Sequence, residues 1–422
     1  MPYPPSRLID EIRAGNCVAF VGAGFSAPSV RGWRPLLESL ATSPSLDEMD
    51  RHRVTRLIGG PPTSKDLEAA AQILRDRLGG EAFSNALQAA MPEPPLGPQM
   101  EHRLSLLKGI PFRSVLTTNF DGLLPGLPPG RDAYLRVLRP SGHRWWDDRY
   151  WSSRSGPDVV HLHGHVENPA ELVFTKADYR RRLYASPGYT TFLRSVMSTT
   201  TVLYLGFSFT DAYLDELRSE VLALLDYRGG DEPIAYALLH GVDEDEIEFA
   251  RSYEGVEIIP YTADDGHGEF DQFLEELHAL TNPAALLGSL LAGKHILWVD
   301  PDAASIDHGM DFLESAAEGT ATIERCDSAS AAIDAAANSI IDLIVTRWGF
   351  GEGAGSDPVA VDLLRNVRER DVRAPIVVFA SGSHADENKR TAMSLGATSY
   401  EFTWAGLFQE IERIFTPGSS HR

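Results

Sequence analysis

The chain has 422 residues, of which 43% are hydrophobic and 23% are charged, and its formal net charge is −22. This length allows two or more domains, each with its own hydrophobic core. The excess of negative charge disfavours nonspecific binding to nucleic acid or to an anionic membrane, so we expect neither as a partner.

Cysteine usage and the amino-terminal segment bear on the cellular compartment. The two cysteines, Cys17 and Cys326, lie in or beside apolar stretches, and two distant cysteines cannot form a zinc ribbon. Buried thiols in a reducing environment are therefore expected. The segment MPYPPSRLIDEI has no apolar signal-peptide core, and no run of about 18 apolar residues occurs in the sequence. We predict a cytoplasmic protein without a membrane span.

Apolar runs alternate with helical segments through the first 282 residues. Helices are expected over residues 7–14, 64–90 and 270–280. Strands are expected where short apolar runs occur, at 17–21, 113–118, 158–163, 199–205, 233–239 and 256–261. Strands that alternate with helices predict a parallel sheet with helices on both faces.

Polar clusters follow four of these predicted strands, at residues 22–26, 119–122, 163–164 and 206–208. Because the carboxyl ends of parallel strands meet at one edge, we expect one shared site. Gly22, Gly24 and Ala27 fit the loose G-x-G-x-x-G/A pattern of turns that approach a pyrophosphate. A redox dinucleotide fold is disfavoured, because Pro28 falls where the long helix would run and no acidic residue ends a strand at the usual distance.

A second alternation follows a predicted linker at residues 283–293. Its strands are expected at 295–299, 320–325, 342–346, 375–380 and 399–402, and its helices at 303–316, 328–338, 357–370, 386–395 and 404–415. Five β/α units within 294–417 have the size of one doubly wound α/β domain. Residues 418–422 are expected to be a disordered tail.

Four motifs of the first part resemble the sirtuin (Sir2) superfamily in both identity and order. They are GAGFS at 22–26, TTNFD at 117–121, HG at 163–164 and GFS at 206–208, and LVFTKADY, LYLGFSFTD and EIIPY agree with them. The resemblance covers roughly residues 1–282 and is closest to the bacterial Sir2-like, NAD-consuming branch found in antiphage defence. It implies a Sir2-type Rossmann-like parallel sheet with a helical insertion.

The resemblance also implies roles for particular residues around NAD⁺ as substrate. The glycine turn would hold the diphosphate and neighbouring ribose, Phe25 would flank the nicotinamide end, and Gly206 with Ser208 would contact the adenosine side. Asn119 would line the nicotinamide-ribose pocket, and His163 would be the general base. The full set of implied NAD⁺ contacts is Gly22, Ala23, Gly24, Phe25, Ser26, Thr118, Asp121, Gly206, Ser208 and Asp211.

Simpler interpretations exist for several of these positions. The segment 119–122 could be only a turn, and Asp211 could only cap the following helix. His161, His163 and His165 share one face of a strand, which can suggest a metal. No cysteine or carboxylate pattern with zinc spacing supports one, so we expect no metal. His163 is preferred as the base because it precedes Gly164, whereas His161 and His165 are expected to be structural or supporting.

The chemistry expected at this site is cleavage of NAD⁺ rather than hydride transfer. Sirtuin deacylases usually carry a four-cysteine zinc module, but residues 166–201 contain no cysteine, which favours water over an acyl-lysine as acceptor. We therefore expect an NAD⁺ glycohydrolase that releases nicotinamide and ADP-ribose, as an abortive-infection effector. The alternatives are an NAD-dependent protein deacylase and a non-catalytic NAD- or ADP-ribose-binding sensor.

The second part resembles a response-regulator receiver domain through ILWVDPD, DLIVTRWG, PIVVFAS and GATSYEFT. Arg347 stands where a receiver carries its phosphoacceptor Asp, Ala380 stands where Thr or Ser is usual, and no Lys lies near Thr403. We expect a pseudo-receiver that serves oligomerisation, most simply as a homo-oligomer, or that senses a partner protein or phage-derived trigger. A generic flavodoxin-like domain is the alternative.

Overall fold

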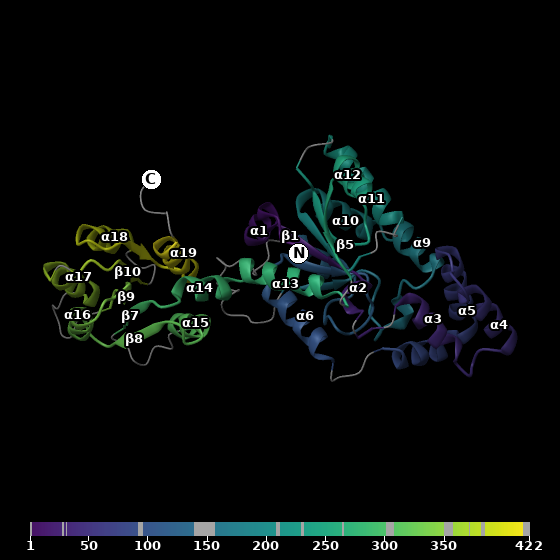
Figure 1. Ribbon diagram of the computed structural model, residues 1–422, viewed down its shortest axis with the longest axis horizontal. Helices are drawn as coiled ribbons and strands as arrows, with labels where there is room; N and C mark the ends of the chain where they lie inside the picture. Colours follow the sequence, from purple (N-terminus) through teal and green to yellow (C-terminus); the bar gives the residue numbers. More distant parts are fainter. Residues whose placement is uncertain are drawn as a thin grey trace. The chain divides into compact units, whose positions relative to one another are not determined.

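The computed structural model describes residues 2–27, 29–30, 32–91, 96–138, 157–207, 212–228, 232–263, 266–300, 308–349, 358–370, 372–380 and 385–416. The described residues divide into two compact units, one ending at His278 and one beginning at Ala279. Each unit is an α/β structure around its own parallel sheet (Figure 1).

The first unit is built on six parallel strands. They are β1 (Cys17–Val21), β2 (Ser114–Thr117), β3 (Val159–His161), β4 (Thr201–Leu205), β5 (Ala235–His240) and β6 (Val256–Tyr261), in the spatial order β3-β2-β1-β4-β5-β6. This is the doubly wound order whose direction reverses between β1 and β4. The predicted Rossmann-like parallel sheet is confirmed.

Strand register brings the ends of the central strands level with one another. Val21 pairs with Thr117 on one side and with Leu205 on the other, and Thr117 pairs with His161 of β3. All five residues of β1 are buried, as expected for a strand covered on both faces. The segments that follow β1, β2, β3 and β4 therefore start at one common edge.

Helices cover both faces of this sheet, and Figure 1 shows α10, α11 and α12 on the side opposite α6 and α13. The helices around the sheet are α1 (Ser6–Arg13), α2 (Ala23–Ser26), α6 (Pro98–Gly109), α7 (Arg131–Leu138), α9 (Lys176–Ala185), α10 (Pro187–Thr199), α11 (Ala212–Leu224), α12 (Glu244–Tyr253) and α13 (Gly268–Thr281), with a 3-10 turn η1 (Pro169–Glu171). Val18 and Phe20 belong to one hydrophobic cluster with residues of α7, α10, α11 and α12. Ala19 points to the other face by strand alternation.

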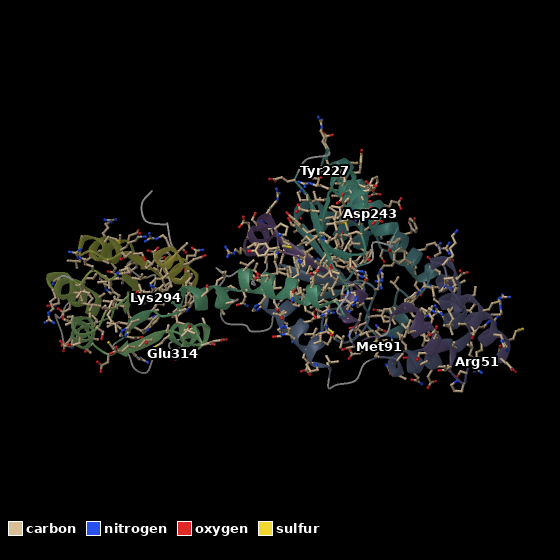
Figure 2. The ribbon with its side chains drawn as sticks, viewed as in Figure 1. Arg51, Met91, Tyr227, Asp243, Lys294 and Glu314 are labelled. Carbon is tan, nitrogen blue, oxygen red and sulfur yellow. The ribbon has the colours of Figure 1, made fainter. Side chains whose placement is uncertain are left out.

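A helical insertion lies between β1 and β2. It consists of α3 (Trp33–Ala41), α4 (Glu48–Ile58) and α5 (Ser64–Ala89), and α5 is kinked at Gly79. Its core of leucine, alanine and aromatic side chains also contains Leu172 and Phe174, from the segment after β3. Arg51, labelled in Figure 2, donates to the carbonyl oxygens of Ala41 at 3.1 Å and Leu46 at 3.0 Å and so fixes the loop between α3 and α4. The predicted insertion is confirmed, and it packs against the segment that follows β3.

The second unit is a five-stranded parallel sheet with the order β11-β10-β9-β7-β8. Its elements are α14 (Pro283–Leu291), β7 (His295–Val299), α15 (His308–Ala317), β8 (Thr322–Cys326), α16 (Ala329–Asn338), β9 (Leu343–Arg347), α17 (Val359–Glu369), β10 (Ile376–Phe379), α18 (Ala385–Ser394), β11 (Ser399–Glu401) and α19 (Trp404–Phe415). Counted within the unit, this is the order 2-1-3-4-5 of flavodoxin and receiver domains. The expected flavodoxin- or receiver-like α/β fold is confirmed by this topology, which the two alternatives share.

Residues 283–293, expected as a linker, are largely helical. Helix α14 begins after Asn282, whose side chain accepts a hydrogen bond from the Ala285 N–H at 3.0 Å. Leu287 and Leu291 lie four residues apart, so they share one helix face, and both are buried in the core of the second unit. Within the described ranges, no helix is long and apolar enough to cross a membrane.

Candidate functional site

The site lies at the switch point between β1 and β4, where two turns are in close contact. The Gly22 N–H donates to Leu205 O at 2.9 Å, and the Gly24 N–H donates to Gly206 O at 2.9 Å. A Cβ on Gly22 would lie 2.6 Å from Gly206 O, and a Cβ on Gly206 would lie 2.1 Å from the Phe25 nitrogen. Gly206 also has φ +64, which disfavours any side chain. Glycine is thus required at both positions.

Phe25 lies outside the pocket that the sequence assigned to it. Its side chain is fully buried, and its ring centroid lies 6.3 Å from that of Phe270 of α13. The one-turn helix α2 directs this side chain into the core below the glycine turn. Local sequence could not reveal this orientation, because the contact partner lies more than two hundred positions along the chain.

Asn119 is held by the residues around the ends of β1 and β2. The Thr117 hydroxyl donates to Val21 O at 2.9 Å and accepts from the Asn119 N–H at 3.0 Å. The Asn119 side-chain Nδ2 donates to Gly22 O at 3.1 Å and to the Ser26 hydroxyl at 3.0 Å. Because Gly22 O can only accept, the amide orientation is fixed. Both N–H bonds are used, which leaves the Asn119 Oδ1 as the acceptor for a ligand.

Asp121 is a buried carboxylate beside this network. Its side chain is 4% exposed, and Oδ1 accepts from the Leu123 N–H at 3.1 Å. Burial raises the pKa of Asp121, and the Leu123 N–H, the charge of His161 and a hydrogen bond from Ser26 oppose that rise. The Ser26 hydroxyl therefore accepts from Asn119 and also interacts with Asp121, so it lies between the two side chains.

A pocket of about 280 Å³ opens in front of these residues. It is lined by Ala23, Val30, Trp33, Leu36, Met91, Thr118, Asn119, Phe120, Asp121, His163, Val173 and Phe174. The rings of Trp33, Phe120 and Phe174 touch one another and form its aromatic wall, with centroids 4.8 to 6.5 Å apart. The helical insertion contributes part of this wall, so it closes one side of the pocket.

His163 reaches the same pocket from the segment after β3. The His163 carbonyl accepts from the Val173 N–H at 2.9 Å, and its ring stands perpendicular to that of Tyr179 with centroids 5.6 Å apart. The pocket thus combines one imidazole, one carboxylate and one amide with an aromatic wall. This combination suits proton transfer next to a developing positive charge.

The predicted site residues fall into five groups. Those lining the pocket are Ala23, Thr118, Asn119, Asp121 and His163. Gly22 and Ser26 bond to Asn119, and Gly24 and Gly206 join the two turns, whereas Phe25 is in the core. Ser208 and Asp211 lie outside the described residues, as does Pro28.

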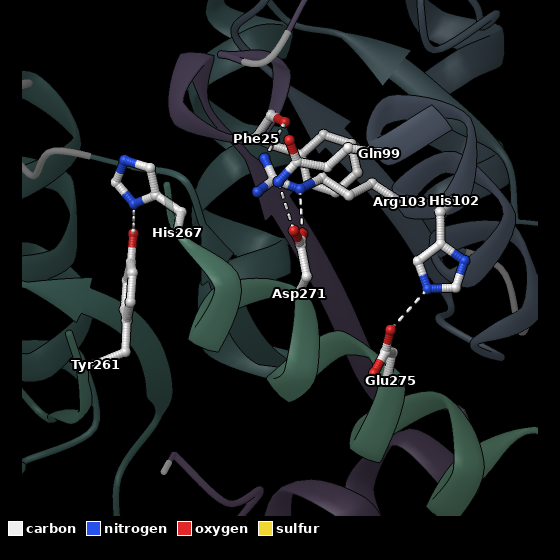
Figure 3. A network of polar contacts seen from close by, with 8 residues as sticks. All are labelled: Phe25, Gln99, His102, Arg103, Tyr261, His267, Asp271 and Glu275. Carbon is white, nitrogen blue, oxygen red and sulfur yellow. Dashed lines mark hydrogen bonds and ion pairs between the residues drawn. The ribbon is translucent and has the colours of Figure 1, made fainter. Parts of the chain in front are cut away.

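Sequence reasoning missed a buried ionic network below the glycine turn (Figure 3). Arg103 of α6 is 1% exposed; its Nε donates to Asp271 Oδ1, and its Nη1 donates to Phe25 O at 3.0 Å. Gln99 donates to Asp271 Oδ2 at 2.6 Å, and the guanidinium lies 4.7 Å from the Phe270 ring centroid. Arg103 thus fixes the carbonyl end of α2. An arginine within a helical pattern carries no signal for such a role.

In the part of the chain that the structure describes, no group of three or more His, Cys, Asp or Glu side chains could hold a metal ion. The rings of His161 and His165 are perpendicular to each other, with centroids 4.8 Å apart. The polar side chains of the pocket are arranged around Asn119 instead.

Comparison with known proteins supports the family resemblance. Residues 113–259 match the family model of the SIR2-like domain, which confirms the resemblance to Sir2-like proteins over that range. Relatives named NAD(+) hydrolase ThsA are 27% identical over 51% of this chain in Enterococcus faecium and 26% identical over 50% of it in Bacillus cereus (strain MSX-D12). A third, from Acinetobacter baumannii (strain 532279), is 25% identical over 51% of this chain.

The chain spans less than half of the length of these relatives, with 42%, 41% and 41% of each covered. Among solved structures, the Francisella response regulator 1452 receiver domain is 17% identical with a TM-score of 0.24, and it is matched over 29% of this chain and 96% of its own. FixJ-N is 22% identical with a TM-score of 0.24, matched over 31% of this chain and 95% of its own. The receiver-like assignment rests on the strand order alone.

Proposed function

We propose that the first unit hydrolyses NAD⁺ to nicotinamide and ADP-ribose. The observation that carries this proposal is the joint placement of Asn119, Asp121 and His163 around one pocket next to the glycine turn. The relatives at 25 to 27% identity that bear the name NAD(+) hydrolase support it. We prefer water to an acyl-lysine as acceptor because no cysteine of a zinc module lies between residues 166 and 201.

In this reaction the bond between C1′ of the ribose and the nicotinamide nitrogen breaks, and its electron pair stays on the nicotinamide. A water oxygen forms the new bond to C1′, and His163 accepts the proton that the water releases. Nicotinamide leaves as a neutral molecule because its ring nitrogen is positive while attached to the ribose. The proton then passes to solvent, which restores His163.

Asn119 and Asp121 would each assist this step, Asn119 by orienting a reacting group and Asp121 by stabilising the developing positive charge. The fixed Oδ1 of Asn119 accepts from a ribose hydroxyl or from the attacking water without adding charge. The carboxylate of Asp121 stabilises the positive charge that develops at C1′. The aromatic wall formed by Trp33, Phe120 and Phe174 excludes water from the pyridinium, which strengthens both effects.

The test is NAD⁺ turnover by the full chain, with nicotinamide release measured by chromatography. Asn119→Ala and His163→Ala are compared with two matched controls on exposed helix faces, Asn338→Ala and His52→Ala. We expect both site variants to lose at least about 100-fold in rate, since general base catalysis alone contributes about 10² to 10⁴. Equal turnover in site variants and controls would refute the assignment.

We further propose that the second unit regulates this activity without phosphorylation. Arg347 ends β9, pairs with the buried Asp300 at 3.9 Å, and lies over the ring of Phe379 with its guanidinium carbon 5.2 Å from the centroid. Arg347 offers no carboxylate oxygen at this strand end to take the phosphoryl group that a phosphoacceptor Asp would take. The unit would therefore act through homo-oligomerisation or through a partner protein or phage-derived trigger in abortive infection. Incubation with acetyl phosphate should leave the chain unmodified by mass spectrometry.

A further inference from the structure

His161 contacts both ends of the loop that carries the pocket residues. His161 is the last residue of β3, and its side chain is 1% exposed. Its Nδ1 lies 2.9 Å from Asn119 O, and its Nε2 lies 2.6 Å from Leu124 O. Residues 119–124 form the loop between these two carbonyl groups, and this loop carries Asn119 and Asp121 to the pocket. One ring therefore closes the loop.

These two contacts determine the protonation state of the ring. A backbone carbonyl oxygen can only accept, so each ring nitrogen must donate. Neutral imidazole has a single N–H, and its other nitrogen would direct a lone pair at a carbonyl oxygen no more than 2.9 Å away. Only the imidazolium ion, with two N–H groups, satisfies both contacts.

The charged groups around His161 fit an imidazolium at this position. Asp121 is buried and interacts electrostatically with His161. His165 is a second ring beside His161, and its Nδ1 lies 3.3 Å from the Glu167 nitrogen and 3.6 Å from Glu167 Oε2. Burial, followed by the charge of His161, lowers the pKa of His165, while Glu167 and Asp121 oppose that shift. Among the described groups, Asp121 is thus the buried carboxylate that interacts with His161, and burial favours the neutral form of His165.

We propose that His161 is a positioning residue that acts as a buried imidazolium ion, closing the loop 119–124 around the pocket with Asp121 as its counter-ion. Its bond to Asn119 O fixes the backbone of the residue whose side-chain amide is tied to Gly22 and Ser26. The free Asn119 Oδ1 is thereby held at one position. His161 is then a cationic ring behind the loop, whereas His163 is the imidazole that lines the pocket.

The protonation part of the proposal is tested without any substrate. The full chain is labelled with nitrogen-15 at histidine only, and two-bond proton–nitrogen correlation spectra are recorded between about pH 6 and pH 9, which brackets the ordinary histidine pKa of about 6.5. We expect one ring to keep the imidazolium pattern at about pH 7.5, one unit above the ordinary histidine pKa, where ordinary rings have largely lost it. His161→Gln should abolish that signal alone. His165→Ala serves as the matched control and should leave it.

Each outcome of this experiment decides the proposal. Loss of every imidazolium pattern by about pH 7.5, one unit above the ordinary value, would overturn it. So would a persistent signal that survives His161→Gln. If His161→Gln fails to fold, Asp121→Asn takes its place: removal of the counter-ion should make the persistent signal titrate at lower pH, and an unchanged titration would count against the pairing.

The positioning part rests on the proposed NAD⁺ hydrolysis and has its own readout. We expect His161→Gln to lower kcat at least about 10-fold while KM changes less than about 3-fold, because transition-state positioning rather than binding is lost. Since His161 acts through Asn119, the His161→Gln/Asn119→Ala double variant should be no slower than Asn119→Ala alone. Additive losses would overturn this part. A chain that turns over no NAD⁺ would remove the proposed function but leave the spectroscopic result standing.

Discussion

The buried pair between Arg103 and Asp271 offers a quantitative test of what holds the glycine turn in place. Arg103→Met keeps the length of the side chain but removes its charge, its ion pair with Asp271 and its hydrogen bond to Phe25 O. The side chains of Arg103 and Asp271 are 1% and 16% exposed. Breaking a buried pair by removing one partner costs about 3–5 kcal/mol, because the other charge is left without compensation.

The expected cost lies toward the lower end of that range. Asp271 retains its hydrogen bond from Gln99 at 2.6 Å and is partly accessible to water, so its orphaned charge is not fully desolvated. We therefore expect the first unit to lose about 3 kcal/mol of unfolding free energy. Because the chain has two units, hydrogen exchange with mass spectrometry on peptides of α6 and α13 is the suitable measurement.

A double variant separates the orphaned charge from the lost packing. Arg103→Met/Asp271→Leu removes both charges, so it should recover a large part of the stability that Arg103→Met loses. The matched control is His102→Met/Glu275→Leu, which removes the neighbouring pair, whose side chains are 50% and 53% exposed, and should change stability by less than about 1 kcal/mol. The reasoning is refuted if Arg103→Met costs less than about 1 kcal/mol or if the double variant recovers nothing.

Three further predictions concern the turn, the acid limit of activity and the thiols. Gly206→Ala should lower the unfolding free energy of the first unit by more than roughly 1–2 kcal/mol, the cost of placing alanine in a left-handed conformation. The loss should be larger because the added Cβ would also meet the Phe25 nitrogen. A smaller loss in a urea titration would contradict this close approach. Burial raises the pKa of Asp121, so a reaction that needs its carboxylate should lose rate, as the pH is lowered, at a higher pH than it would with an ordinary Asp. The Asp121→Asn variant should be slow, and its pH–rate profile should lack this acidic fall. Cys17 and Cys326 are buried, and burial raises the pKa of both thiols, that of Cys326 to about 11. Iodoacetamide at about pH 8 should therefore label neither cysteine until urea is added. Rapid labelling of the native protein would contradict their burial.

The strands and the shared edge of the first sheet could be predicted because each strand is a short apolar run that ends in glycine or a polar cluster. The register of Val21 with Thr117 and Leu205 then brings the clusters together, as expected for parallel strands. Helix α14 escaped prediction because its glycine and small residues suggested a linker, whereas its Leu287 and Leu291 form a buried face.

Contacts between distant segments could not be predicted in the same way. Arg103 and Asp271 are 168 positions apart, and neither belongs to a motif. The alternation of His161, His163 and His165 was visible in the sequence, but which ring faces two carbonyl groups depends on the path of the loop after β2. No sequence pattern determines the path of this loop. Sequence patterns thus identified the segments of the site and left the orientation of their side chains open.

The glycine turn illustrates why one residue type can satisfy two different requirements. A glycine at Gly22 suits a turn that approaches a phosphate, and it also suits a turn packed against another backbone. In this structure the second requirement is met, because the N–H groups of Gly22, Gly24 and Phe25 each donate to a protein carbonyl group. A phosphate that takes one of these N–H groups must break the bond it already makes. The glycines therefore serve first to bring the ends of β1 and β4 together, and through Gly22 O they orient Asn119 toward the pocket.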